Sequence, residues 1–431
     1  MMGLLIVADD LSGAADSAIA CTQTGLCATV SLGDGAVEPS AEVLAVDCDT
    51  RGLSAHEAAE RVGRLVSRYV TVPDLLLFKK IDSTLRGNIG AELAAMLAVR
   101  RAASTTGRRV VIVMAPAFPA GGRTTVDGCQ FVHGVALHET ETWASYADKS
   151  AAHLPTSLTK TGLEVATLGL DKVRAGNDAL IRAMQDASAD ADVLICDAET
   201  DADLRAIAES SMVLGSETIW AGSAGLAYHL PHAAGLAGEL DALADVSVTS
   251  CAGPALVLVG TMSSVTREQA KTLAAQEDVE LLALAASVLL AGPGSEAWAG
   301  YSLRLTEALR GGRDSIVMLE ADAQHEQSDG AALAKALGVM ISPHADKVGA
   351  LIASGGETAR SILALWGVTQ LRLIGELEPG LPVSVTAGWS RSMLVITKAG
   401  AFGTPQTLVR CLEFVRSRSL ERAGILRGIT R

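Results

Sequence analysis

The chain has 431 residues, more than a single hydrophobic core usually supports, so two domains are expected. Apolar residues make up 49% of the chain and aromatic residues only 3%, which favours open α/β sheets with a core of Ala, Val, Leu and Ile over a β-sandwich. The net charge of −14 and the scarcity of aromatic side chains argue against nucleic acid as a partner. A small anionic substrate is still compatible with this charge, because local cations can reverse the field inside one site.

The compartment expected from the sequence is the cytoplasm. The seven cysteines contain no C-x-x-C pair, which is typical of a reducing environment. The apolar run before Asp9 is too short for a signal peptide, and the longest later run, 281–293, is too short to cross a bilayer. No membrane partner is therefore expected, and self-association as a homo-oligomer is left open.

Short apolar runs that are followed by a polar or glycine-rich turn and an amphipathic stretch indicate βα units. We expect strands at Leu4–Ala8, Leu75–Ile81, Val110–Met114, Val193–Cys196, Thr218–Ala221, Ala255–Val259, Ile316–Leu319, Ala350–Ala353 and Met393–Thr397. The predicted fold class is α/β, with two α/β domains, largely parallel sheets and a ligand cleft between the domains. The predicted boundaries are 1–232 and 253–431, joined by a linker at 233–252 that is rich in Ala, Gly and Asp.

The first predicted strand ends in Asp9 and Asp10, and a helix is expected from Ala14. Ligands of open α/β sheets bind outside the carboxyl ends of the strands, so this is a candidate site. Two adjacent carboxylates there could bind Mg²⁺, hold substrate hydroxyls or accept a proton. The alternative is that one Asp, or Ser12, only caps the helix.

The second turn follows Leu75–Phe78 and contains Lys80, Asp82, Ser83 and Arg86. Cations, an acid and hydroxyl groups at one strand end are typical of an anion-binding pocket with an embedded acid. The alternative is a solvated helix start capped by Asp82 or Ser83.

A third turn, 115–125, contains two prolines and two adjacent glycines that shape a loop before Arg123. Arg123 could bind a carboxylate or phosphate, or form a surface ion pair.

Three glycine turns follow successive strands in the second half. They contain Ser263, then Gly355, Gly356, Glu357 and Thr358, and finally Gly400 and Gly403. Small residues at a helix start let backbone N–H groups approach a phosphate, so these turns indicate a nucleotide site. Thr266 and Gln269 have the spacing of a capping box. The chain has no Gly-Lys dipeptide, which excludes a Walker A loop.

These turns, in this order and spacing, resemble the four-carbon acid sugar kinase family over nearly the whole chain. The matching segments are ADDLSGA (8–14), KKIDSTLRGN (79–88), APAFPAGGRTT (115–125), CDAETDADL (196–204), WAGSAGLA (220–227), GTMSS (260–264), SGGET (354–358) and KAGAFG (398–403). Ser12 and Ala401 stand where the family usually has Thr and Asn.

The resemblance implies an N-terminal domain that binds the acid sugar and a C-terminal domain that binds ATP. It implies phosphorylation of the terminal hydroxyl of a tetronate or 3-oxo-tetronate, with Mg²⁺ on the phosphates. By motif, the sugar side comprises Asp9, Asp10, Lys80, Asp82, Ser83 and Arg86, and the ATP side comprises Ser263, Gly355, Gly356, Glu357, Thr358 and Gly400.

Phosphoryl transfer depends mainly on positioning and charge neutralisation. We expect Lys80 and Arg86 to hold the substrate carboxylate or the γ-phosphate, and Asp10 or Asp82 to act on the hydroxyl. The sequence does not choose between the two aspartates and gives no metal ligands. The alternatives are a nicotinamide-dependent hydroxy-acid oxidoreductase, for which a proper G-x-G-x-x-G is missing, and a hydroxy-acid sensor without turnover.

Overall fold

The computed structural model divides the chain into two compact units, Met1–Leu243 and Ala244–Arg431. It describes residues 2–33, 41–144, 148–236, 253–260, 263–320, 330–400 and 402–422. The division falls inside the segment 233–252 that was expected to be a linker, of which 237–252 lies outside the described residues. Thr261, Met262 and Ala401, which belong to two of the family-like segments, are outside them too.

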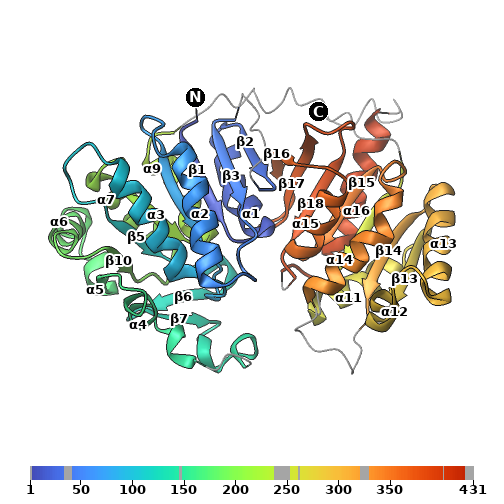
Figure 1. The fold of residues 1–431 in the computed structure, drawn as a ribbon, viewed down its shortest axis with the longest axis horizontal. Coiled ribbons are helices and arrows are strands. Elements are labelled where there is room, and N and C mark those ends of the chain that lie inside the picture. The colour runs from blue at the N-terminus through green and yellow to red at the C-terminus, as the bar shows by residue number, and fades with distance from the viewer. Residues whose placement is uncertain are drawn as a thin grey trace. The chain divides into compact units, whose positions relative to one another are not determined.

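The main sheet of the first unit is parallel. Its described strands follow the order β2 (Ala28–Ser31), β3 (Val43–Asp47), β1 (Leu4–Ala8), β4 (Leu76–Lys80), β11 (Ile219–Gly222), β5 (Ile112–Ala115), β10 (Val193–Cys196) and β9 (Val165–Leu168). Strands β1, β3 and β4 are buried at every position, because helices cover both faces of the sheet (Figure 1).

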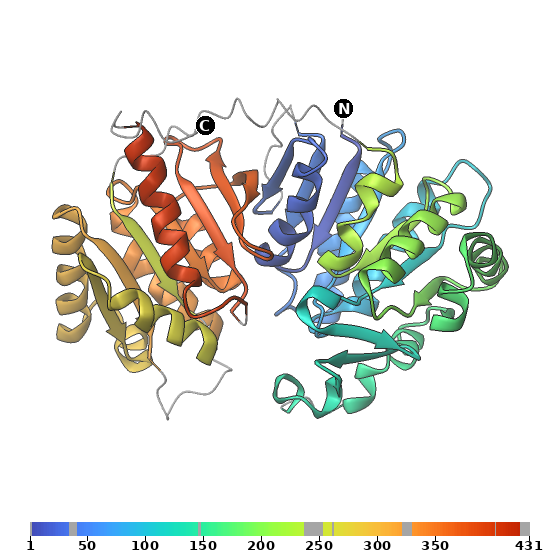
Figure 2. The same ribbon diagram turned by 180° about the vertical axis from the view of Figure 1, so that it is seen from behind.

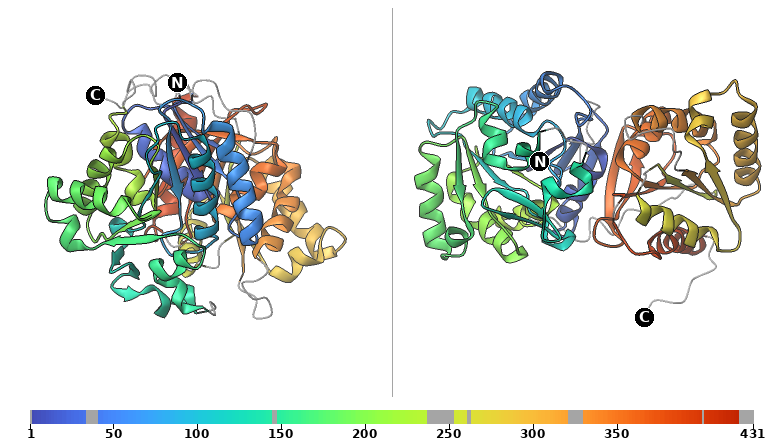
Figure 3. Two further views of the ribbon diagram at one scale, coloured as in Figure 1. Left: turned by 60° about the vertical axis from the view of Figure 1, so that its left-hand side comes forward. Right: turned by 90° about the horizontal axis from the view of Figure 1, so that it is seen from below.

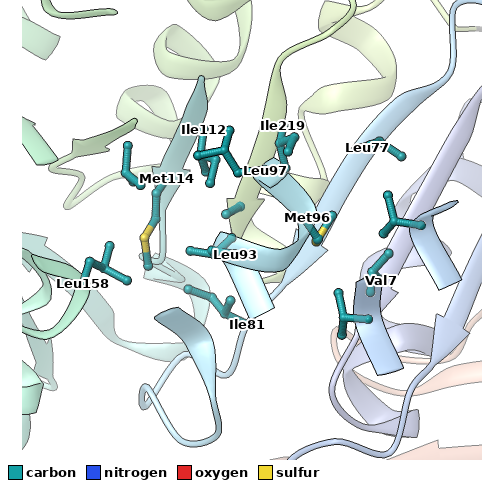
Figure 4. Close-up of a cluster of buried hydrophobic side chains, with 14 of the residues drawn as sticks. Val7, Leu77, Ile81, Leu93, Met96, Leu97, Ile112, Met114, Leu158 and Ile219 are labelled. Atoms are coloured by element: carbon teal, nitrogen blue, oxygen red, sulfur yellow. The ribbon is translucent and has the colours of Figure 1, made fainter. Parts of the chain in front are cut away.

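The helices of the first unit form two layers. They are α1 (Leu11–Thr22), α2 (Ala55–Tyr69), α3 (Ile89–Ala103), α4 (Leu154–Thr159), α5 (Leu170–Val173), α6 (Asn177–Ser188), α7 (Asp201–Ser211), α8 (Ala224–Ala227) and α9 (Leu230–Ala233). Helices α2 and α3 pack together on one face, and α1, α7, α8 and α9 lie on the other (Figures 1 and 2). Leu93, Met96 and Leu97 of α3 pack against strand residues such as Leu77 and Ile219 to form the core (Figure 4).

A small antiparallel sheet stands apart from the parallel one at one end of the first unit (Figure 3). It consists of β6 (Arg123–Val126), β7 (Cys129–Val132) and β8 (Val135–Ala136). The β6–β7 turn is fixed by Asp197, at the end of β10, whose carboxylate accepts the N–H groups of Asp127 (2.6 Å) and Gly128 (3.0 Å). Asp197 of the CDAETDADL segment therefore has a structural role here.

The described strands of the second unit follow the order β13 (Val279–Leu284), β14 (Asp314–Leu319), β12 (Ala255–Val259), β15 (Ala350–Ser354), β18 (Leu394–Lys398), β17 (Pro382–Ala387) and β16 (Gln370–Glu376). The first five strands are parallel, whereas β17 and β16 are antiparallel. Its helices are α11 (Ser264–Ala274), α12 (Ala286–Ala291), α13 (Glu296–Arg310), α14 (Gly330–Ile341), α15 (Gly356–Leu365) and α16 (Thr407–Arg422). Helices α11 and α16 pack on each other over one face (Figure 2), and α14 packs on α15 over the other.

Both units share one topological feature. In each, the first four strands follow the spatial order second, third, first, fourth. The chain moves from the first strand to one side and later returns to the other side, so the loops after the first and fourth strands diverge. Such a reversal in an open α/β sheet leaves a crevice at the carboxyl ends of these strands. The candidate ligand-binding positions are therefore the carboxyl ends of β1 and β4 in the first unit, and those of β12 and β15 in the second.

The predicted α/β class is confirmed, and each of the nine predicted strands overlaps an observed one. The prediction missed β2, β3, β6, β7, β8, β9, β13, β16 and β17, several of which contain four residues or fewer or alternate with polar ones. Helix α1 begins at Leu11 rather than Ala14, because Asp10 caps it. No helix in the described ranges combines the length and apolar character needed to cross a membrane.

Candidate active site

Asp10 begins helix α1. Its Oδ1 accepts the N–H of Gly13 at 2.9 Å, so the capping alternative is correct for this residue. Its Oδ2 accepts a hydrogen bond from Arg51. Gly13 leaves room for both groups, because a Cβ there would lie 2.6 Å from Asp10 Oδ1 and 2.9 Å from Lys80 Nζ and would displace them. The close approach shows that the Lys80 ammonium from β4 lies beside the start of α1.

Asp82 and Arg86 form a forked ion pair in the turn after β4. Arg86 donates from Nε (2.6 Å) and Nη2 (3.1 Å) to the two oxygens of Asp82, and Thr84 donates its hydroxyl to the same carboxylate. Leu85 has φ +56°, a left-handed conformation that costs energy for a residue with a Cβ. Two side chains from elsewhere in the chain hold the turn in this conformation. Trp143 donates from Nε1 to Thr84 O at 2.8 Å, and Gln130 donates to Ser83 O at 3.0 Å.

Arg51, which the sequence analysis did not select, joins the two strand ends. Its Nε lies 2.7 Å from Asp9 Oδ2, its Nη1 2.9 Å from Asp10 Oδ2 and its Nη2 3.9 Å from Asp82 Oδ1. We call Asp9, Asp10, Arg51, Asp82 and Arg86 the Arg51 cluster. The missed signal was strand β3, whose apolar run VLAVD ends four residues before Arg51 in the same way as the strands that were predicted.

The cluster shifts the pKa values of its members. Burial acts to raise the pKa of Asp82, but Arg86 and Arg51 outweigh it and hold the pKa well below its usual value. Burial likewise opposes ionisation of Asp9, but Arg51, Lys79 and Lys80 lower its pKa. Although burial acts to lower the pKa of Arg51, the surrounding carboxylates raise it. Asp9 and Asp82 are therefore carboxylates, and Arg51 is a cation, at neutral pH.

Asp9 keeps one oxygen for another group. Its side chain is 4% exposed, and Oδ1 is buried and accepts no hydrogen bond within the described residues. A buried carboxylate oxygen without a donor is costly, so it indicates a place for a ligand hydroxyl or for water.

Lys79, the neighbour of Lys80, forms its ion pair outside the cluster. It is fully buried and pairs with Glu92 of α3 at 2.8 Å, and its Nζ also donates to Lys80 O. Burial lowers the pKa of Lys79, but Glu92 and Asp9 raise it above the usual value. This buried pair connects β4 to α3 next to the site.

Arg123 lies at the start of β6. Burial lowers its pKa, whereas the charge of Asp82 raises it and that of Arg86 lowers it, so its guanidinium is near both groups. The structure thus brings Asp9, Asp10, Lys80, Asp82, Arg86 and Arg123 to one end of the first sheet. Ser83 takes part through its backbone carbonyl.

In the second unit, the turns after β12, β15 and β18 lie on adjacent parallel strands. Ser263 is the N-cap of α11, and Gly355 (φ +105°) is the N-cap of α15. The first residues of α15 are Gly356, Glu357 and Thr358, whose N–H groups have no acceptor within the helix. Thr358 packs so closely on Gly260 that a Cβ there would lie 1.9 Å from its Oγ1.

The capping box predicted from Thr266 and Gln269 is wrong. Both residues are buried inside α11, and their side chains bind the turn after β18 instead. Thr266 donates its hydroxyl to Gly400 O, and Gln269 donates from Nε2 to Phe402 O at 3.0 Å. The three-residue spacing of Thr266 and Gln269 places both side chains on the helix face toward the loop that contains Gly400 and Gly403.

Known proteins match both units. A family model described as a sugar-binding N-terminal domain matches residues 4–230, and one described as a nucleotide-binding C-terminal domain matches 256–408. A D-threonate kinase of Cupriavidus necator is 38% identical, covering 94% of this chain and 96% of that protein. A 3-oxo-tetronate kinase of Methylobacterium radiotolerans is 30% identical, covering 96% and 99%. A crystal structure from Salmonella typhimurium shares the fold, with a TM-score of 0.77 at 20% identity over 95% of this chain and 99% of that one.

The matches define a protein that joins a sugar-binding domain to a nucleotide-binding domain. The chain belongs to the four-carbon acid sugar kinase family, as the resemblance of its turns predicted.

Proposed function

We propose that this protein is an ATP-dependent kinase that phosphorylates the terminal hydroxyl of a four-carbon acid sugar, such as D-threonate, D-erythronate or a 3-oxo-tetronate. The observation that carries the proposal is the convergence of carboxylates and cations at the ends of β1 and β4, in the unit that matches a sugar-binding domain. Relatives that extend over nearly the whole chain are D-threonate and 3-oxo-tetronate kinases, which supports the substrate class.

The acid sugar offers a carboxylate and several hydroxyls, and the Arg51 cluster has groups for each. Asp82 occupies Nε and Nη2 of Arg86, which leaves Nη1 for the substrate, and Lys80 and Arg123 supply further positive charge. The buried Oδ1 of Asp9 would accept a substrate hydroxyl. Each substrate group thus has a partner of opposite polarity.

We assign the proton transfer to Asp10. The acceptor hydroxyl oxygen forms a bond to the γ-phosphorus of ATP as the bond to the ADP oxygen breaks, and the hydroxyl proton passes to the Asp10 carboxylate. Asp82 is less suited, because Arg86 and Arg51 hold its pKa well below the usual value and so make it a weak base. We propose that Asp82 positions Arg86.

ATP would bind the second unit, with its phosphates on the N–H groups at the start of α15 and in the turn after β18. Mg²⁺ would arrive with the nucleotide. The described residues contain no group of three His, Cys, Asp or Glu side chains arranged as metal ligands, and Asp9 is surrounded by Arg51, Lys79 and Lys80, which repel a cation. We therefore assign no protein-held metal site.

The cytoplasm is the compartment that we propose. The six cysteines in the described ranges remain thiols, and burial raises the pKa of Cys21 and Cys411 to about 12, so neither forms a reactive thiolate.

One assay tests the function: ADP release measured with Mg²⁺ and ATP across D-threonate, D-erythronate, L-threonate and 3-oxo-tetronates. We expect ADP to form with at least one of these acids and to stop when the acid is omitted. Tight binding of an acid by calorimetry without ADP release would refute the kinase and favour the sensor.

A further inference from the structure

Lys398, the last residue of β18, is a buried cation that pairs with no carboxylate in the described part of the chain. Its side chain is among the largest that are fully buried, and no acid of the described residues forms an ion pair with it. Its Nζ instead donates to Ala399 O and Phe402 O, both at 2.9 Å, with Gly400 O at 3.4 Å and Thr266 Oγ1 at 3.0 Å. Burying an ammonium costs free energy unless hydrogen bonds compensate it, and here the loop carbonyls supply most of them. The loop conformation and the burial of Lys398 therefore depend on each other.

The inward carbonyls determine where the N–H groups of the loop point. In a planar trans peptide, the C=O of one residue and the N–H of the next point in opposite directions. Because Ala399 O and Phe402 O turn toward Lys398, the N–H groups of Gly400 and Gly403 turn away from it. Neither donates to an acceptor in the described part of the chain.

Three further contacts hold this arrangement. Thr266 and Gln269 of α11 donate to Gly400 O and Phe402 O, respectively, which are also bound by Lys398. The backbone of Lys398 accepts the N–H of Gly355 at 3.0 Å, so the same residue fixes the turn that begins α15. Lys398 therefore connects the turns after β15 and β18.

We propose that Lys398 is a positioning residue of the nucleotide site. It does not touch the phosphates. It holds the carbonyls of Ala399, Gly400 and Phe402 inward, so that the N–H groups of Gly400 and Gly403 are presented to a phosphate together with those of α15, and its charge behind the loop adds to their attraction for an anion. This inference rests on the proposal that ATP binds the second unit.

Protonation of Lys398 provides a specific readout. Burial lowers its pKa to about 8. An ammonium has three N–H donors, whereas a neutral amine has two, so deprotonation weakens the hold on the four surrounding oxygens and removes the charge. Among the neighbouring groups, Thr266, Gln269 and Ser354 are uncharged, and burial raises the pKa of the Cys411 thiol to about 12. Glu378 and Arg410, whose charges also act on Cys411, are paired with each other. We therefore expect ATP affinity to fall as the pH rises through about 8.

Calorimetry with ATP and with D-threonate on the full chain tests the proposal, using Lys398→Met, Lys398→Arg and wild type. We expect Lys398→Met to weaken ATP binding about 10–100-fold, the range of hydrogen bonds to a charged group, with D-threonate affinity unchanged. The ATP Kd of wild type should rise between pH 7 and pH 9, whereas that of Lys398→Met should stay flat. Lys398→Arg should keep the charge throughout and lose the inflection.

A folded Lys398→Met that binds ATP as tightly as wild type, or that loses both ligands equally, would overturn the inference. If Lys398→Met does not fold, Thr266→Val decides instead, because it removes only the hydroxyl between Lys398 and Gly400 O; unchanged ATP affinity in that variant, with no pH dependence in wild type, refutes the proposal. Gly356→Val distinguishes a failure of the role of Lys398 from a failure of the proposed nucleotide site. If it weakens ATP while Lys398→Met does not, only the role of Lys398 fails, and if neither variant weakens ATP, the nucleotide is not bound at these turns.

Discussion

Asp10 and Asp82 differ in the number of donors that neutralise them. Asp82 accepts two hydrogen bonds from the Arg86 side chain, one from the Arg86 backbone N–H and one from Thr84, and lies near Arg51, whereas Asp10 accepts one from Arg51 and one from the Gly13 N–H. A carboxylate that is held by a forked guanidinium is a structural anion, whereas one with fewer donors keeps lone pairs that can accept a substrate hydroxyl.

Asp10→Asn should therefore lower kcat by about 10²–10⁴ at saturating substrate, the usual contribution of a positioned base. The fold should be preserved, because Asn caps a helix as well as Asp does. Asp82→Asn should act mainly on KM for the acid, since Arg86 loses its anchor. Steady-state kinetics and circular dichroism on both variants check this, and near-normal turnover of Asp10→Asn would mean that positioning alone activates the hydroxyl.

Arg51 stabilises the first unit by compensating three carboxylates. We expect Arg51→Gln to lower the free energy of unfolding by about 2–3 kcal/mol at pH 7, less than the ~3–5 kcal/mol of a fully buried pair, because a fifth of the Arg51 side chain is exposed. The sign follows from the lowered pKa values of Asp9 and Asp82: their stabilising contribution is present above the ordinary Asp value of 3.8 and is lost as the pH falls through the folded-state pKa.

Urea unfolding of wild type and Arg51→Gln at several pH values measures this difference. The gap between the two proteins should be largest at neutral pH and should shrink below about pH 4 as the carboxylates become protonated. Arg64→Gln is the matched control, because the pair that Arg64 forms among the described residues is with Glu60 on the exposed face of α2. A gap that does not change with pH would show that Arg51 acts through packing.

At the scale of the elements, the turn after β4 is held by a side chain that is distant in sequence. Trp143 donates to Thr84 O beneath the left-handed Leu85. Trp143→Phe should cost about 1–3 kcal/mol of stability, the penalty for an unsatisfied buried carbonyl, and should raise KM for the acid by loosening the turn. Trp220→Phe removes an equivalent indole bond, to Ser211 Oγ at 2.8 Å, away from the turn.

Denaturant unfolding and kinetics on the two tryptophan variants separate stability from substrate binding. Both should be destabilised by similar amounts, and only Trp143→Phe should change KM. If Trp143→Phe and Trp220→Phe had equal KM values for the acid, the turn would keep its conformation without the Trp143 indole.

Local sequence signals predicted elements well where one short apolar run ends in a distinctive turn, as at β1, β4 and β15. They failed where a neighbour far along the chain decides the structure. Arg51 was missed because its role depends on three acids from two other strand ends, and Thr266 and Gln269 were misread because their partners lie about 130 residues further on. Helix α1 was started three residues late, although Asp10 had been named as a candidate cap.

At the scale of the whole molecule, the acid and the nucleotide are assigned to separate units. Arg86→Lys should raise KM for the acid far more than KM for ATP, because an ammonium cannot hold Asp82 with two donors and also reach the substrate. Gly356→Val should do the reverse, since a branched side chain blocks the approach of a phosphate to the start of α15.

Kinetics for both substrates on each variant check the assignment, and each variant serves as the control for the other. Arg174→Lys is a further control, because Arg174 makes the same forked contact with Asp203 outside the Arg51 cluster and should leave both constants unchanged. If Arg86→Lys and Gly356→Val alter the same constant, the division between the units is wrong.

Selection can act on the two reversal points separately, because each sheet completes its own order of second, third, first and fourth strand with its own core. A substitution at the ends of β1 and β4 leaves the glycine turns after β15 and β18 intact. Under the proposed assignment, a change of acid requires substitutions in the first unit and none in the turns that would bind the nucleotide. Relatives that differ in their acid, D-threonate in one and 3-oxo-tetronate in another, are the diversity that this architecture permits.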